Sequence, residues 1–187
     1  GLAAAILVLL ALRLPLWEAR LSAPQYPDGL RIHAYGDRVV GDLREINELN
    51  HYVGMEAFDA SDVPEMRLWP LAIGAALGGV ALGSLLGPRP LGRLARLGLW
   101  LVPLAALADI QFRLYRYGHS VDPDAPIRLD PFTPLVVGRT KVLNFTTWAY
   151  PGAAIWCLAG AALLVTFAPG LARRGRGWLA ARRGLAR

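Results

Sequence analysis

The chain has 187 residues, 55% of them hydrophobic, and a mean hydropathy of +0.36. This apolar fraction exceeds the roughly 45–50% typical of soluble domains and favours an integral membrane protein, while the formal net charge of +6 must be explained by its distribution. The single cysteine, Cys157, excludes an intrachain disulfide framework and a CxxC metal or redox site.

Four apolar runs each approach the roughly 20 residues that a helix needs to cross a bilayer. They cover residues 1–17, 68–86, 94–114 and 151–169. A cleavable signal peptide is the alternative for the first run, but Arg13 and Pro15 near its end favour a retained helix. We therefore predict an all-α membrane protein with four transmembrane helices and a small periplasmic α+β region formed by its loops.

Basic residues are unevenly distributed over the segments between these runs. The link at 87–93, Arg96 just beyond it and the tail at 170–187 together hold nine Arg and no acidic residue. Residues 18–67 hold five basic and ten acidic residues. Because Lys and Arg favour the cytoplasmic side, we predict a bacterial inner-membrane protein with both termini in the cytoplasm and the loops 18–67 and 115–150 in the periplasm. Topology then explains the positive charge without a nucleic-acid partner, and the tail fits an interfacial helix on anionic lipid.

The second apolar run contains two small-residue motifs, Gly74-x3-Gly78 and Gly79-x3-Gly83. Such spacing lets two helices approach closely. We expect this helix to pack against a neighbour, either in this chain or in a partner.

The first long loop has the pattern of a folded segment. Apolar and polar residues alternate over 30–35, and a Gly36-Asp37 turn and a second short run follow, which predicts a β-hairpin over 30–40. Asp42 and Glu45 then have the spacing of a capping box before a short helix. The second loop is rich in proline, so we expect an extended, irregular segment there.

All three His and both Met of the chain fall in the two long loops, at His33, His51, Met55, Met66 and His119. His51 and Met55 are four residues apart and would share one face of a helix. Imidazole and thioether ligands suit copper, particularly Cu(I), so these five residues form a candidate metal site. The competing interpretation is structural, because two such residues at helical spacing arise often by chance.

Asp109 lies late in the third run, four residues before Arg113. A carboxylate inside a membrane is a functional candidate by default, but a local ion pair that orients the helix is the simpler account. The sequence has no P-loop, no Rossmann glycine pattern and no GxSxG nucleophile motif. We therefore expect a protein that is not an enzyme.

The stretch APQYPDGLRIHAYGDRVVGDLREINELNHYVGM, followed by PEMRLWP, resembles small polytopic bacterial membrane proteins associated with nitrous oxide reductase gene clusters. LYRYGHSVDPDAPIRLDPFTPLVVGRTKVLNFTTWAYPG is similar to the same group. The resemblance implies an accessory role near a periplasmic copper enzyme, in copper delivery, maturation or electron supply. On this resemblance His51, Met55, Met66 and His119 would carry the copper role, whereas His33 would not be fixed.

Two functional hypotheses follow. The first is an accessory membrane protein that handles copper at the periplasmic face. The alternative is a structural subunit, without a metal of its own, of a respiratory, photosynthetic or copper-monooxygenase complex. In both, the partners are the lipid bilayer and other membrane or periplasmic subunits. A small transporter is disfavoured because the apolar runs carry almost no polar residues at mid-depth.

Overall fold

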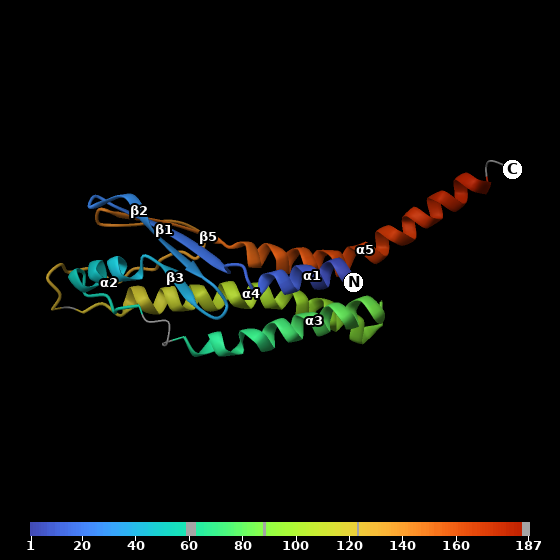
Figure 1. The fold of residues 1–187 in the computed structure, drawn as a ribbon, viewed down its shortest axis with the longest axis horizontal. Coiled ribbons are helices and arrows are strands. Elements are labelled where there is room, and N and C mark those ends of the chain that lie inside the picture. Colours follow the sequence, from blue (N-terminus) through green and yellow to red (C-terminus); the bar gives the residue numbers. More distant parts are fainter. Residues whose placement is uncertain (59–62, 88, 123, 185–187) are drawn as a thin grey trace.

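The computed structural model describes residues 1–58, 63–87, 89–122 and 124–184, and the surroundings of side chains as far as Ala168. The molecule is elongated, and a set of long helices at one end continues into a five-stranded sheet at the other (Figure 1). We call residues 17–58 and 110–151 the head. The bundle comprises residues 1–16, 63–87, 89–109 and 152–168. One long helix runs through both parts.

Four helices form the bundle: α1 (Leu2–Ala11), α3 (Trp69–Leu85), the first part of α4 (Pro90–His119) and α5 (Ala153–Gly184). Its core consists mainly of small and branched apolar side chains, so the helices approach closely. Val8 of α1 and Leu158 of α5 are fully buried there, beside Ile73 and Val80 of α3 and Leu99 of α4. α1 packs mainly on α5, and α3 packs mainly on α4.

Among the described residues, two helical segments are long and apolar enough to cross a membrane, Pro64–Leu85 and Pro90–His119. Two further apolar helices, Leu2–Ala11 and Ala153–Ala168, are shorter within the described residues. A five-stranded antiparallel sheet is also present. The prediction of an all-α fold with four transmembrane helices is therefore wrong, and the fold is α+β.

The first predicted span fails because its end belongs to the sheet. The helix α1 ends at Ala11, and strand β1 begins at Trp17, the last residue of that predicted span. The amide of Leu16 donates to the carbonyl of Ala34 at 2.7 Å, and the amide of Ala154 donates to the carbonyl of Pro15 at 2.9 Å. These bonds tie the connection at residues 15–16 to β2 and to α5.

The sheet is antiparallel throughout and has the strand order β3-β2-β1-β5-β4. Its strands are β1 (Trp17–Ala23), β2 (Tyr26–Ala34), β3 (Val39–Gly41), β4 (Gly138–Val142) and β5 (Phe145–Pro151). The central pair, β1 and β5, joins the two long loops into one structure, with Trp17 opposite Pro151 and Ser22 opposite Thr146. The expectation of an irregular second loop is therefore wrong for residues 138–151.

The predicted hairpin over residues 30–40 is confirmed as β2 and β3. The predicted short helix is present as α2 (Leu43–Tyr52), which begins directly after Asp42. The capping box is absent, because the Asp42 side chain makes no cap bond and instead accepts a hydrogen bond from the amide of Arg31 at 2.8 Å. This bond fastens the start of α2 to β2.

The two glycine motifs of α3 have different surroundings. A Cβ atom on Gly79 would lie 3.0 Å from Cγ of Leu99, and one on Gly83 would lie 2.8 Å from Cγ1 of Val165. A Cβ on Gly74 or Gly78 would meet no atom within 4 Å. The second motif therefore serves packing inside the chain, against α4 and α5.

The backbone of α5 continues as helix to Gly184. The predicted interfacial character of the tail at 170–187 depends on side chains, and on residues 185–187, that lie outside the described part of the chain.

Candidate functional site

An apolar cavity of about 150 Å³ lies between the inner face of the sheet, α2 and the last turns of α4. Leu21 and Ile32 of the sheet, Ile46 and Val53 of α2 and Leu114 of α4 contribute to its walls. A space of this size is large enough for a small apolar molecule such as benzene. The cavity wall contains no charged residue, and its polar side chains are Tyr117, Thr140 and Thr147.

Asn50 is the only polar residue that is buried in the described part of the chain, at 7% exposure. Its amide nitrogen donates to the hydroxyl of Tyr117 on α4. One turn earlier, the Asn47 side chain accepts from the amide of Phe58 at 2.7 Å and donates to the carbonyl of Phe58 at 3.1 Å. These bonds fix α2 between α4 and the segment that follows α2, which indicates a structural role.

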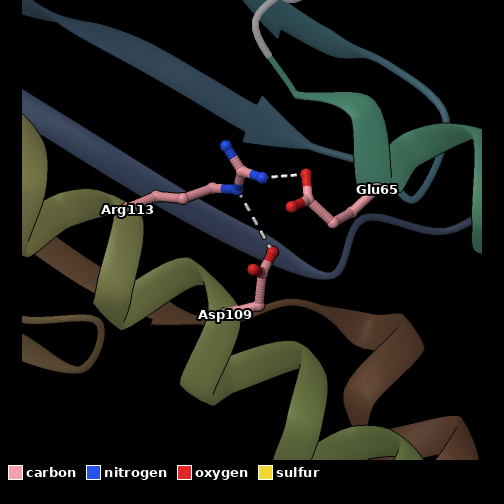
Figure 2. Close-up of polar contacts among 3 residues, drawn as sticks. All are labelled: Glu65, Asp109 and Arg113. Atoms are coloured by element: carbon pink, nitrogen blue, oxygen red, sulfur yellow. Dashed lines mark hydrogen bonds and ion pairs between the residues drawn. The ribbon is translucent and has the colours of Figure 1, made fainter.

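A cluster of three charged residues lies where the bundle meets the head (Figure 2). The Arg113 Nε donates to Asp109 Oδ2 at 3.2 Å, one helical turn away on α4. The same guanidinium bonds to Glu65, which lies on the 3-10 helix η2 (Pro64–Leu68) just before α3. The predicted ion pair between Asp109 and Arg113 is confirmed. Glu65 was not foreseen, because only the fold brings η2 beside α4.

Two of the predicted metal ligands have other partners. His33 lies on β2, opposite Glu18 of β1, with His33 Nδ1 and Glu18 Oε2 3.6 Å apart. The His119 ring stacks on Tyr115 with a centroid distance of 4.0 Å, and its Nδ1 lies 2.8 Å from the Tyr115 carbonyl oxygen. His33 and His119 are thus positioned by different elements of the head.

His51 and Met55 do not share a helical face. The helix α2 ends at Tyr52, and Gly54 turns the chain with a φ of +71°, so Met55 lies beyond the helix. Met55 instead forms an isolated β-bridge with Val121, two residues after His119. The fold therefore brings the segments of His51, Met55 and His119 together at one end of the head.

Met66 lies elsewhere, on η2 beside the charged cluster. Within the described residues, no group of three or more His, Cys, Asp or Glu side chains is placed to hold a metal ion. Copper binding stays a prediction from the sequence, and three of its five candidate ligands, His51, Met55 and His119, lie on neighbouring segments.

The outer surface of the bundle is unusually apolar. Leu71 of α3 is 70% exposed, and Leu97 and Leu101 of α4 are 61% and 62% exposed. Only 28% of the most apolar stretch in the segment Pro64–Leu85 is buried, and only 17% of the corresponding stretch in α4.

Comparison with known proteins finds no matching family model, no matching curated protein and no matching solved structure.

Proposed function

We propose that this chain is an accessory integral membrane protein of the bacterial inner membrane. The helices α3 and α4 anchor it, and the head acts on the periplasmic side as a docking module for other subunits. In this proposal the chain assists a larger assembly and performs no catalysis of its own.

The observation that carries the proposal is the exposure of apolar side chains on α3 and α4. Soluble proteins rarely leave contiguous apolar patches larger than a few hundred Å² open to water. Along α4 the exposed Leu recur roughly every three residues, and they extend along the helix far beyond one turn. These are Leu91, Leu94, Leu97, Leu101 and Leu104. A surface of this kind is stable when hydrocarbon replaces water around it.

The charge distribution supports the proposed orientation. The helices α3 and α4 are joined by a short link at the end of the bundle remote from the head (Figure 1). Arg89, Arg93 and Arg96 lie at that link, and no acidic residue accompanies them there. Because Arg near the end of a span favours the cytoplasmic side, the head would lie in the periplasm.

The construction of the head supports docking over catalysis. Its sheet is built from two distant segments through the β1–β5 pair, which gives a rigid platform at the end of the anchors. The side chains of the buried Asn50 and the half-buried Asn47 and Tyr117 bond to one another and to backbone. The copper hypothesis is compatible with this role and concerns only the far end of the head.

The proposal is tested by membrane extraction and by labelling. Membranes from cells that express the full chain are washed with alkaline carbonate, and the protein should stay in the pellet. In a Cys157→Ser background, Thr146→Cys in the head should react with a membrane-impermeant maleimide on intact spheroplasts. Arg89→Cys, in the link, is the matched control and should react only after lysis. Release by carbonate, or labelling of both positions alike, would overturn the proposal.

A further inference from the structure

The outer face of the sheet carries a row of basic and aromatic side chains. Residues opposite one another on antiparallel strands point to the same side of the sheet. Arg20 lies opposite Arg31 on one side and opposite Trp148 on the other, and Trp148 also lies opposite Arg139. The row therefore crosses four adjacent strands. The guanidinium carbon of Arg139 lies 5.4 Å from the Trp148 ring centroid, in cation–π range.

The neighbouring rows extend this surface. Lys141 lies opposite Thr146 in the row towards the tip, and Tyr150 lies opposite Glu18 in the row towards the bundle. We call the six residues Arg20, Arg31, Arg139, Lys141, Trp148 and Tyr150 the basic face. All six are exposed, with Trp148 at 52% and Tyr150 at 48%. Trp17, Ala19 and Ala149 alternate with them and are buried on the inner side of the sheet.

The basic face holds four cations beside one carboxylate, Glu18, which lies opposite Tyr150 and 3.6 Å from Nδ1 of His33. The ion pairs found in the described part of the chain join other residues, and none of them involves Arg20, Arg31, Arg139 or Lys141. Arg20 uses one nitrogen to donate to the carbonyl oxygen of Asp28 at 2.8 Å, which orients the side chain without cancelling its charge. Like charges directly opposite on neighbouring strands destabilise a sheet. The Arg20–Arg31 pair is therefore an unfavourable feature that a bound anion would offset.

We propose that the basic face binds an acidic surface segment of a partner protein. Charge complementarity carries the assignment, and Arg, Trp and Tyr are the residue types most enriched at the energetic centres of protein interfaces. The inference rests on the proposed function, which places the head in the periplasm, where nucleic acid is not the expected partner. The sheet lies beyond the end of α1 and alongside the later part of α4 (Figure 1), whereas the leucines proposed to contact lipid lie at Leu91–Leu104, in the first half of α4.

Binding can be measured with the full chain in nanodiscs of neutral phosphatidylcholine, with poly-L-glutamate as the acidic probe. The test variant is Arg31→Gln with Arg139→Gln, which removes two charges of the row and the cation–π contact with Trp148 but no side-chain hydrogen bond. The control is Arg38→Gln with Arg44→Gln, which removes the same charge away from the face, where each Arg pairs with a neighbouring carboxylate. We expect binding about tenfold weaker in the test variant, since each surface charge contact changes affinity about two- to fivefold. The control should change it less than twofold.

Three further binding measurements test other possible ligands of the basic face. An oligo-dT strand, vesicles of anionic lipid and a second copy of the chain at raised concentration are each compared between the two variants. Equal loss of glutamate binding in both variants would show an effect of net charge alone and overturn the inference. Tighter binding of any of the other three through Arg31 and Arg139 would overturn it as well.

The inference and the proposed function fail in different ways. If the chain does not enter nanodiscs, the proposed membrane anchor is wrong. If the chain enters nanodiscs but the test and control variants bind the probe alike, the proposed membrane anchor is supported and only the inference about the basic face is wrong.

Discussion

The indole ring of Trp69, the first residue of α3, lies directly against Gly36 in the turn between β2 and β3. Both residues are buried, and a Cβ atom on Gly36 would overlap the ring. This contact joins the head to α3. Because the site is filled, adding a single methyl group at Gly36 should disturb the packing between the head and α3.

Gly36→Ala should lower the free energy of unfolding by about 1–3 kcal/mol, the usual range for overpacking a filled site. The measurement is thermal unfolding of the full chain in nanodiscs, followed by near-UV circular dichroism. Adding Trp69→Ala to Gly36→Ala should recover part of the loss, because the larger partner is then absent. A double-mutant cycle without coupling would show that the two residues do not contact.

The glycines of α3 offer a matched pair of substitutions. Gly83→Ala should lower stability by about 1 kcal/mol, because its Cβ would approach Val165 Cγ1 to 2.8 Å and Arg96 Cγ to 3.1 Å. Gly78→Ala makes the same chemical change where nothing lies within 4 Å, and the higher helix propensity of Ala should leave stability unchanged or raise it by up to about 1 kcal/mol. Thermal unfolding in nanodiscs measures both. The same sign of change in both variants would contradict the packing described here.

Local sequence patterns predicted the parts of this fold that local interactions determine. The run at 68–86 corresponds to α3 within one residue at each end, and the hairpin at 30–40 and the helix after Asp42 are present. Apolar periodicity and turn residues lie within the segments themselves, so they are visible without knowledge of the rest of the chain.

The central strand pair was not predictable in the same way. The strands β1 and β5 are about 130 residues apart along the chain, and their pairing turns Trp17 from the end of a predicted span into the first residue of a sheet. Apolar and polar residues alternate in WEARLSA, as expected for strand β1. The continuous apolar run before it nevertheless made one longer helix, ending at Trp17, the simpler interpretation. The basic face was missed for the same reason, since Arg20, Trp148 and Arg139 become neighbours only through β1, β5 and β4.

The charged cluster at Arg113 should contribute modestly and in a salt-dependent way. Glu65→Gln should lower stability by less than about 1 kcal/mol, because Glu65 is 48% exposed and Arg113 is 28% exposed. Thermal unfolding at low and high NaCl should show the difference from the unmodified protein shrinking as salt rises. Glu48→Gln removes the more exposed pair with Arg44 on α2 and should change nothing measurable. A salt-independent loss at Glu65 would indicate packing in place of charge.

The copper hypothesis from the sequence now makes a sharper prediction. If Cu(I) binds through the head, Met55→Leu with His119→Ala should weaken it at least tenfold, since the β-bridge from Met55 to Val121 holds these segments together. His33→Ala with Met66→Leu is the control and should leave affinity unchanged, because His33 pairs with Glu18 and Met66 lies on η2. Competition with a chromophoric Cu(I) chelator measures both. Equal effects of the two double variants would remove the hypothesis.

The Arg20–Arg31 pair predicts that binding and stability oppose one another at the basic face. Arg31→Gln should raise the free energy of unfolding by a few tenths to about 1 kcal/mol, since cross-strand like charges cost that much and the Arg31 amide still donates to Asp42. The same substitution should weaken binding of poly-L-glutamate. Thermal unfolding and binding are therefore measured on one preparation, with Arg38→Gln as the control for net charge. If Arg31 served only the structure, its replacement would lower the stability of the protein, so a fall in stability on Arg31→Gln would count against a binding role. A gain in stability together with weaker binding would indicate that Arg31 is retained for binding.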